Sequence, residues 1–233
     1  MSKLATENNA INLSQGFPNF PVDPKLIEIY QQKLNEDVHQ YAPMPGNSRL
    51  LTEIAELVES SYGRRLNPSE EILITAGATQ GIFTAITALI LQGDEVVILD
   101  PSYDCYEPSI TLTGGIPIRV QLNTDFLPNW NAIENAISEK TRMIIINNPH
   151  NPSGRIWDKS DMDALEKLVL KFPKLLVLSD EVYEFITFEQ KHISAHDYQR
   201  IYDQLITVSS FGKTFHITGW KMGYLTAPKS LMT

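Results

Sequence analysis

The chain has 233 residues, of which 42% are hydrophobic and 20% are charged, a composition typical of an ordinary soluble globular protein with a full core. Its formal net charge of −9, with Lys and Arg scattered along the sequence, argues against a nucleic-acid partner. The single cysteine, Cys105, and the lack of a signal peptide or an apolar run of roughly 20 residues favour a cytoplasmic protein without a membrane partner.

Residues 1–46 differ in pattern from the rest of the chain. The stretches "INLSQGFPNFPVDPK" and "QYAPMPGNSR" contain five prolines and two glycines. Prolines restrict both their own backbone and that of the preceding residue, so such stretches are typical of extended loops. We therefore expect an N-terminal arm and loop over residues 1–46 and a main domain over residues 47–233.

Seven short apolar runs follow, each too short for a typical helix and rich in Ile, Val and Leu, as expected of strands buried on both faces. They cover residues 72–74, 95–99, 117–122, 143–146, 175–178, 205–208 and 222–226. Helical patterns lie between most of them, including "NSRLLTEIAELVESSYG", which Asn47 can cap, and "DKSDMDALEKLVLKF". This alternation predicts an α/β fold with three layers, α/β/α, around a mostly parallel seven-stranded sheet. The connection before the last run is short, which predicts that this strand is antiparallel.

Ligands of an open parallel sheet bind beyond the carboxyl ends of its strands, so the residues after each run are the first candidates for a site. After the first run, "TAGATQG" offers backbone N–H groups of Gly77, Ala78 and Thr79 at a helix start, which suits a phosphate but also fits a tight turn capped by Thr79. "DPSYDCY" places Tyr103 at the rim, where an aromatic can also be a core edge. "NNPHNPSG" places Asn151 after a proline-locked turn, where asparagine is also a common turn former.

Charged residues follow the fifth and sixth runs. In "LSDEVY", Asp180 ends an apolar run, where an ionised carboxylate is costly unless a cation or a hydrogen-bond donor contacts it, and Tyr183 follows three residues later. In "SSFGKT", Ser210 and Lys213 follow the sixth run. Lys213 has two uses there, as a salt-bridge partner for Asp180 or as a nucleophilic amine with a lowered pKa.

Three other readings of these motifs are weaker. A phosphate-binding P-loop needs a glycine five positions before Gly212, where the sequence has Thr207. The glycine spacing of "GATQG" does not match the dinucleotide fingerprint, although Asp100 stands at about the right distance for its acidic residue, so a dehydrogenase stays open. His192 and His196 are four residues apart in a polar, loop-like stretch without a carboxylate pattern, so we expect no metal site.

Taken together, the motifs resemble the class I and II aminotransferases of pyridoxal-phosphate fold type I, because they follow the family's order along nearly the whole chain. They are "SQGFPNF", "QYAPMPG", "TAGATQG", "DPSYDCY", "NNPHNPSG", "SDEVY" and "SSFGKTFHITGWKMGY". The motifs "GFP", "DCYEP" and "TGWKMG" are most similar to those of the methionine and kynurenine/glutamine transaminase branch of this family. Family members continue into a small C-terminal domain with an arginine for the substrate carboxylate, so the resemblance implies a chain truncated before that domain.

The resemblance implies pyridoxal 5'-phosphate as the cofactor. Lys213 would form an aldimine with it and then shuttle the proton at the substrate's α-carbon. Asp180 would pair with the pyridine nitrogen, Tyr183 and Asn151 would hydrogen-bond the ring's 3-oxygen, and Tyr103 would stack on the ring. The residues implied to hold the phosphate are Gly77, Ala78, Thr79, Ser210 and Lys221. The residues implied to contact substrate are Gly16, Asn151 and Tyr41, the last reaching into a partner's site, so a homodimer with a shared active site is expected.

The amino-acid sequence leaves three functions open. The first is an enzyme of amino-acid metabolism that moves an amino group from a methionine, aromatic, kynurenine or glutamine type of donor to a 2-oxo acid. The second is a β-lyase acting on cysteine conjugates or cystathionine, which would release pyruvate and ammonia. The third is a domain that keeps the fold without turnover, which absence of cofactor absorbance would favour. Without the C-terminal domain, we expect the chain to transaminate poorly or not at all.

Overall fold

The computed structural model describes residues 1–14, 16 and 20–232, in two compact units of which the second begins at Tyr41. The first unit contains two helices, α1 (Ser2–Glu7) and α2 (Pro24–Lys33), which the expectation of an extended arm missed. Helix α2 forms because the Asp23 side chain accepts a hydrogen bond from the Lys25 amide at 2.8 Å and Pro24 occupies the first turn, where its missing N–H costs nothing. The domain boundary between residues 46 and 47 stays a prediction.

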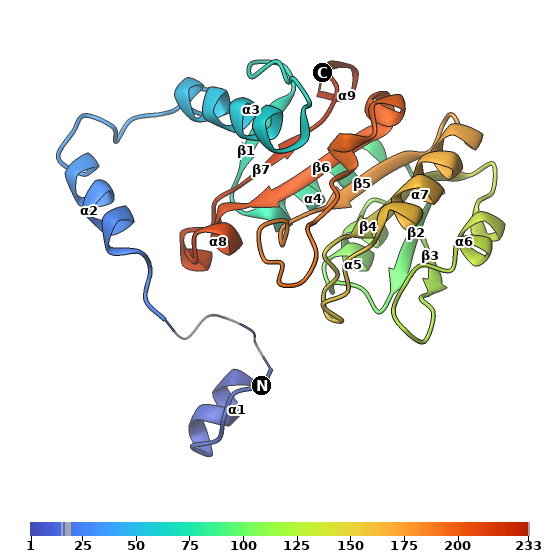
Figure 1. Ribbon diagram of the computed structural model, residues 1–233, viewed down its shortest axis with the longest axis horizontal. Helices are drawn as coiled ribbons and strands as arrows, with labels where there is room; N and C mark the ends of the chain where they lie inside the picture. Colours follow the sequence, from blue (N-terminus) through green and yellow to red (C-terminus); the bar gives the residue numbers. More distant parts are fainter. Residues whose placement is uncertain (15, 17–19, 233) are drawn as a thin grey trace. The chain divides into compact units, whose positions relative to one another are not determined.

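The second unit is built on one seven-stranded sheet with the order β1-β7-β6-β5-β4-β2-β3 (Figure 1). Its strands are β1 (Ile72–Thr75), β2 (Glu95–Asp100), β3 (Ile116–Gln121), β4 (Thr141–Asn147), β5 (Leu176–Asp180), β6 (Leu205–Ser210) and β7 (Gly223–Thr226). Strands β3, β2, β4, β5 and β6 pair in parallel, whereas β7 pairs antiparallel with both β6 and β1. The predicted mostly parallel sheet and its antiparallel last strand are confirmed.

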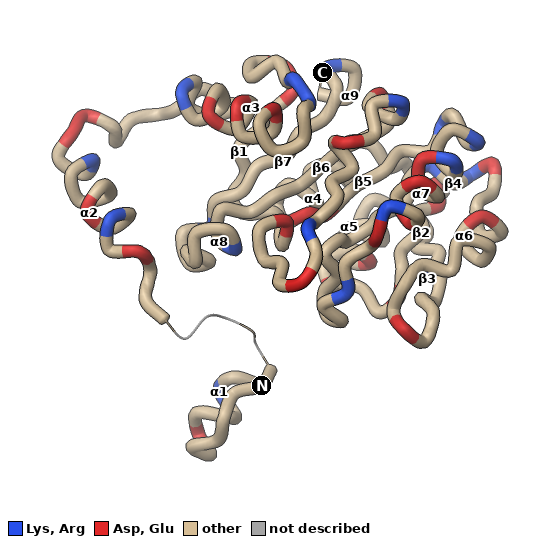
Figure 2. Tube along the Cα trace, viewed as in Figure 1, with Lys and Arg blue, Asp and Glu red and all other residues tan. Residues whose placement is uncertain are grey.

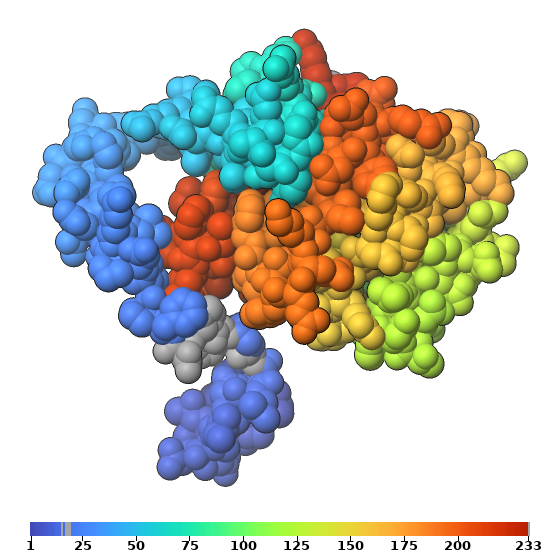
Figure 3. Space-filling view, in the orientation of Figure 1, coloured from blue at the N-terminus to red at the C-terminus, as the bar shows by residue number. Residues whose placement is uncertain are grey.

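Helices cover both faces of this sheet. They are α3 (Ser48–Tyr62), α4 (Ala78–Leu89), α5 (Tyr106–Leu112), α6 (Trp130–Ala136), α7 (Lys159–Lys171), α8 (Phe211–Thr214) and α9 (Lys229–Met232), with short 3₁₀ turns η1 (Ala195–Asp197), η2 (Gln199–Gln204) and η3 (Thr218–Trp220). On one face α3, the η1 and η2 turns and α7 lie side by side (Figure 3). Helices α4 and α5 pack on the other face, which confirms the three-layer α/β/α arrangement.

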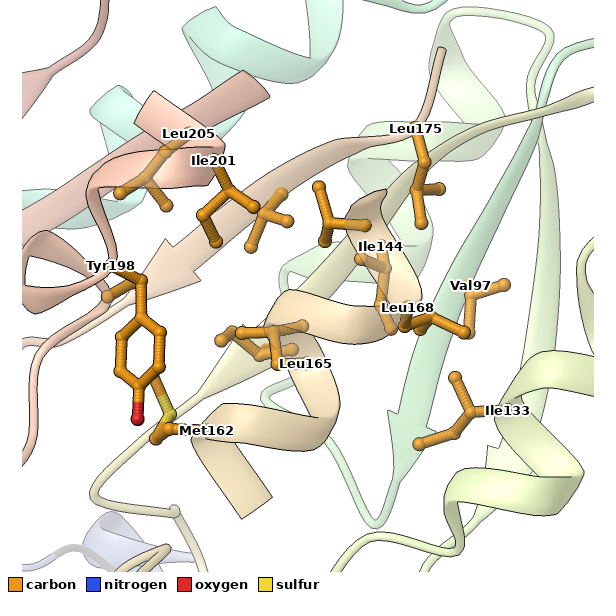
Figure 4. Close-up of a cluster of buried hydrophobic side chains, with 14 of the residues drawn as sticks. Val97, Ile133, Ile144, Met162, Leu165, Leu168, Leu175, Tyr198, Ile201 and Leu205 are labelled. Carbon is orange, nitrogen blue, oxygen red and sulfur yellow. The ribbon is translucent and has the colours of Figure 1, made fainter. Parts of the chain in front are cut away.

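The side chains of each strand point alternately to the two faces of the sheet and so contribute to both apolar clusters. Val177 of β5 belongs to the apolar cluster under α7, where Leu168 lies beside Val97 and Ile144 (Figure 4). Full burial of a side chain such as that of Leu168 stabilises the fold by about 1.5–3 kcal/mol. Leu178, one residue further along β5, belongs instead to the cluster under α4 and α5. Because side chains alternate along a strand, Asp180 at the end of β5 lies on the α4 and α5 face.

The start of α3 gives a test of the predicted cap. The Asn47 side-chain oxygen accepts hydrogen bonds from the amides of Arg49 at 3.0 Å and Leu50 at 3.3 Å. We expect Asn47→Ala to lower the free energy of unfolding by about 1 kcal/mol, because two helix N–H groups lose their acceptor. Urea denaturation measures this, and Asn47→Asp, which keeps an acceptor, is the control. A loss of equal size in both variants would show that capping is not the cause.

Candidate active site

The structure brings most of the candidate residues to one edge of the sheet. They lie at or just beyond the ends of β1 (Gly77, Ala78, Thr79), β2 (Tyr103), β4 (Asn151), β5 (Asp180, Tyr183) and β6 (Ser210, Lys213), and just before the antiparallel β7 (Lys221). The carboxyl ends of the parallel strands and the start of β7 meet there, as their pairing requires. Gly16 belongs to the first unit and Tyr41 has a fully exposed side chain, so their contacts with substrate stay predictions.

The start of helix α4 is closely packed against the start of β7. Gly77 is its N-cap, with φ 83° and ψ 163°, a conformation that favours glycine, so the alternative in which Thr79 caps the helix is wrong. A Cβ on Gly223 would lie 2.7 Å from the Ala78 amide nitrogen, and one on Gly77 would lie 3.9 Å from the Lys221 Cα. The first N–H groups of a 12-residue helix and the backbone of Lys221 therefore share one small region, which suits an anion.

Asp180 is held from two sides. Its side chain is buried, accepting a hydrogen bond from the Tyr106 hydroxyl at 2.6 Å and a longer one from the Val182 amide at 3.3 Å. Its backbone carbonyl accepts hydrogen bonds from the Asn147 side chain at 2.9 Å and the Asn148 amide at 3.1 Å. Burial raises the pKa of Asp180 to about 6, although the donated hydrogen bonds oppose this. The carboxyl group therefore titrates close to neutral pH.

Lys213 stands in α8, at the end of β6, where Figure 2 shows a basic position. It forms no ion pair with Asp180, although the structure describes both residues, so a structural salt bridge does not account for it. Its ammonium lies 5.3 Å from the centre of the Tyr183 ring. Burial lowers the pKa of Lys213, Asp180 opposes that change, and the charge of Lys221 adds to it. A larger share of this amine is therefore neutral than in an exposed lysine.

Asn147 joins two candidate residues and was missed in the sequence. Its side-chain oxygen accepts a hydrogen bond from the Asn151 amide at 2.7 Å, while its nitrogen donates to the Asp180 carbonyl at 2.9 Å. The turn that carries Asn151 is thereby fixed to the end of β5. The available signal was a polar residue directly after the apolar run "MIII", where it is buried.

A network of buried polar side chains holds the residues on either side of Tyr183, namely Glu181 and Glu184. Glu181 accepts hydrogen bonds from His192 at 2.7 Å and the Ala195 amide at 3.0 Å, and Glu184 accepts from Tyr62 at 2.5 Å and from Ser209. Burial would raise the pKa of Glu181, but His192, His196 and the hydrogen bond from Ser194 together outweigh it and lower that pKa to about 2. Glu181 is therefore an anion paired with His192.

This network corrects the interpretation of the stretch around His192 and His196. The sequence suggested a polar loop without a carboxylate, whereas both rings are buried and a carboxylate reaches His192 from β5's end. His196 accepts a hydrogen bond at Nδ1 from the Arg64 guanidinium, 3.2 Å away, and its Nε2 lies 2.9 Å from the Thr207 hydroxyl. Among residues 1–14, 16 and 20–232, no group of three or more His, Cys, Asp or Glu side chains is arranged to hold a metal ion. No helix within those ranges is long and apolar enough to cross a membrane.

The raised pKa of Asp180 predicts a pH-dependent effect of Asp180→Asn. The pKa of Asp180 is about 6 in the folded protein and about 4 in the unfolded chain, so the folded protein binds a proton there below about pH 6, whereas the unfolded chain does so only below about pH 4. Stability from the protonated carboxyl is thus present at low pH and lost as pH rises through 6. We expect Asp180→Asn, without added ligand, to be more stable than the native chain by up to about 3 kcal/mol at pH 8, and little different at pH 4.

Urea denaturation between pH 4 and pH 8 measures this difference. Asp163→Asn is a control of opposite sign, because hydrogen bonds from Lys159 and Tyr198 lower the pKa of Asp163. That variant should lose its difference from the native chain as pH falls rather than as it rises. A pH-independent effect of Asp180→Asn would contradict the assignment of a neutral-range titration to this carboxyl group.

Comparison with known proteins agrees with the motifs. Residues 8–233 match the family model for aminotransferase class I and II. A methionine aminotransferase of Escherichia coli (strain K12) is 44% identical over 230 residues, which make up 98% of this chain and 59% of that protein. A kynurenine–oxoglutarate transaminase of Dictyostelium discoideum is 36% identical over 251 residues, with 99% of this chain and 58% of that protein covered.

Solved structures share the fold. An Escherichia coli structure described with a methionine aminotransferase function has a TM-score of 0.95 at 43% identity, covering 99% of this chain and 61% of that one. The N-succinyldiaminopimelate aminotransferase of Mycobacterium tuberculosis has a TM-score of 0.95 at 35% identity, with the same coverage. The chain spans between 53% and 59% of the length of these and other curated relatives that it matches. From the match over residues 8–233 and the shared fold, the chain belongs to the aminotransferase class I and II family.

Proposed function

We propose that the natural protein containing this chain transfers an amino group from an amino acid to a 2-oxo acid with pyridoxal 5'-phosphate as its cofactor. The observation that carries this proposal is a partly buried amine, Lys213, whose pKa is lowered, at the sheet edge that also holds a buried carboxylate. Such an amine suits carbonyl chemistry, because the neutral form is the nucleophile. The family membership supports the same reaction class.

The residues at the edge fit the cofactor. The start of α4 offers N–H donors for a phosphate, and Lys221, whose backbone lies beside Gly77, can add the positive charge of its side chain. Asp180 offers a fixed, buried acceptor of the kind that a protonated pyridine nitrogen needs, and the pKa of Tyr183 is raised by burial and also by Asp180 and Tyr103, which lie close enough to act on it. When bound, the cofactor supplies an electron sink for the carbanion that forms at the substrate's α-carbon.

Each residue of the chain then has a definite task. The amine of Lys213 would hold the cofactor through its carbonyl carbon with loss of water and, once the substrate's amine has replaced it there, would take and return the proton of the substrate's α-carbon. Asp180 is ionised above about pH 6 and holds the proton on the ring nitrogen. Tyr183 and Asn151 would donate hydrogen bonds to the ring oxygen, and Tyr103 would stack on the ring. The Ala78 and Thr79 amides, the Ser210 hydroxyl and the Lys221 ammonium would hold the phosphate, whereas the Gly77 amide already donates to the Thr75 carbonyl at 2.8 Å, so Gly77 serves as the helix cap beside the seat.

The substrate and the assembly are proposed from the relatives. Those with the printed names methionine aminotransferase and kynurenine–oxoglutarate transaminase favour a methionine, aromatic, kynurenine or glutamine type of donor. We propose a homodimer, in which Tyr41 completes the partner's site and Gly16 contacts the substrate carboxylate together with Asn151. The exposed side chain of Tyr41 is consistent with such a contact. A cytoplasmic enzyme accords with its one cysteine, Cys105.

The test uses the protein at its full natural length with pyridoxal phosphate added. Methionine, phenylalanine, kynurenine and glutamine are offered in turn with a 2-oxo acid, and both the consumed donor and the newly formed amino acid are quantified. One amino acid formed per donor consumed is the expected result. Pyruvate and ammonia from a cysteine conjugate, without a new amino acid, would instead establish a β-lyase. No turnover and no cofactor absorbance would establish a non-catalytic domain.

A further inference from the structure

Tyr106 is the first residue of α5 and lies next to the proposed site, but it is not among the residues proposed to contact the cofactor or the substrate. It follows Tyr103 and Cys105 in the connection after β2, and its side chain is 2% exposed. The ring packs in the apolar cluster under α4 and α5, and only the hydroxyl is polar. That hydroxyl donates to Oδ2 of Asp180 at 2.6 Å, across a separation of 74 residues.

We propose that Tyr106 is a positioning residue that keeps Asp180 ionised and aimed at one point of the sheet edge. Its relevance to catalysis rests on the proposed function, because Asp180 would face the ring nitrogen of the cofactor. The hydrogen bond itself belongs to the chain alone and can be tested without any cofactor.

The contacts of Asp180 single out this phenol. A separation of 2.6 Å lies in the range of strong O–H···O⁻ hydrogen bonds. The other donor, the Val182 amide, is at 3.3 Å, which is a weaker contact. The adjacent Glu181 carboxylate disfavours a second negative charge, and the positive charge of Lys213 acts from beyond ion-pair distance. Of the groups that the structure describes around Asp180, Tyr106 therefore contributes most to holding the anion.

The position of the Tyr106 hydroxyl is itself fixed by its surroundings. The Tyr106 amide donates to the Tyr103 carbonyl at 3.2 Å, and the two rings meet edge to face with centroids 5.9 Å apart. The same residue thus braces the aromatic ring proposed to stack on the cofactor and the carboxylate proposed to bind its nitrogen. Because β4 already fixes the Asp180 backbone through Asn147, the remaining freedom of Asp180 is rotation of its side chain, which the phenol restrains.

The decisive variant is Tyr106→Phe, which removes one buried oxygen and keeps the ring in the core. The titration of the Asp180 carboxyl carbon is followed by ¹³C NMR in the cofactor-free chain, with Asp180→Asn to assign its resonance. The pKa of Asp180, about 6 in the native chain, is expected to rise by about one unit, a tenfold gain in proton affinity. A folded Tyr106→Phe variant with an unchanged Asp180 pKa would overturn the proposal.

Tyr198→Phe is the matched control. Tyr198 is also buried and also donates to an aspartate, Asp163 at 2.9 Å, but in the cluster on the opposite face of the sheet. This variant should raise the pKa of Asp163 and leave that of Asp180 unchanged. A shift of Asp180 in both variants would mean that loss of packing rather than loss of the hydrogen bond is responsible, and would also overturn the proposal.

A second substitution covers the case in which Tyr106→Phe does not fold. Placing 3-fluorotyrosine at position 106 makes the phenol a stronger donor at nearly constant size, so the pKa of Asp180 should fall. An unchanged or raised value would count against the proposal. Loading the chain with ring-¹⁵N pyridoxal phosphate adds a further readout, since Tyr106→Phe should move the ring nitrogen's resonance toward that of an unprotonated pyridine. Failure of the native chain to bind this cofactor would count against the proposed function alone, because the titration uses cofactor-free protein.

Discussion

Lys213→Ala is expected to reduce amino-group transfer by at least about 10⁴-fold while leaving the fold intact, because one amine serves as both nucleophile and proton carrier. Its stability should change by less than about 1 kcal/mol, since the side chain forms no ion pair with Asp180 and lies only over the Tyr183 ring. Single-turnover transfer of the amino group from methionine to a 2-oxo acid in the full-length protein measures the rate. Urea denaturation of Lys213→Ala and of the native protein measures the stability.

Lys221→Ala is the matched comparison for this experiment. Lys221 lies eight residues further along, with its backbone against Gly77 at the start of α4. Its loss should weaken binding of pyridoxal phosphate and leave the rate at saturating cofactor within about tenfold of the native value, because it removes a charge for the phosphate rather than the reacting amine. If Lys213→Ala keeps a rate similar to that of Lys221→Ala, the assignment of Lys213 as the reactant is wrong.

Gly223→Ala is expected to destabilise the chain by about 1–3 kcal/mol and to weaken phosphate binding as well. A Cβ at this position would lie 2.7 Å from the Ala78 nitrogen, 2.8 Å from the Ser209 carbonyl oxygen and 2.9 Å from the Gly77 carbonyl carbon. All three neighbours are backbone atoms, which cannot turn aside as a flexible side chain can. Relief of the clash therefore requires β7 to move away from α4, which separates the two parts of the proposed phosphate seat.

Gly219→Ala is the control for that substitution. It lies four residues earlier in the same connection, and nothing lies within 4 Å of the place where its Cβ would be. Urea denaturation measures stability, and equilibrium dialysis against pyridoxal phosphate measures binding. Equal, small effects of both alanines would show that β7 and α4 can separate without cost, and that the close approach at Gly223 does not hold the seat together.

The sheet could be predicted from the sequence because parallel strands are buried on both faces and so leave unbroken apolar runs. The site residues could be located because they stand directly after those runs. Helix α2 was missed since its proline suggested a loop, whereas Asp23 and Pro24 together form a helix start. The partner of His192 could not be found by the spacing of the histidines, because Glu181 lies 11 residues earlier, at the end of β5, and the intervening turn brings the two side chains together.

Tyr106 illustrates a second limit of sequence reasoning. A tyrosine within an apolar pattern has the same signature whether its hydroxyl meets water or a carboxylate, and its partner is 74 residues away. Asn147 differs, because an amide directly after an apolar run is itself unusual and marks a place where backbone groups need partners. Long-range polar contacts of this kind depend on which strands become neighbours, and that order is a property of the whole sheet.

The strand order also has a consequence for synthesis of the protein. Strand β1 is among the first elements to leave the ribosome, yet its partner in the sheet is β7, with Ile72 opposite Thr226. The intervening strands can pair among themselves as they emerge, and the helix that follows β1 can pack against α5, β5 and β6, but β1 itself must wait for β7. Strand β7 thus completes the proposed phosphate seat, and nascent chains that stop before this strand would carry Lys213 without a complete seat.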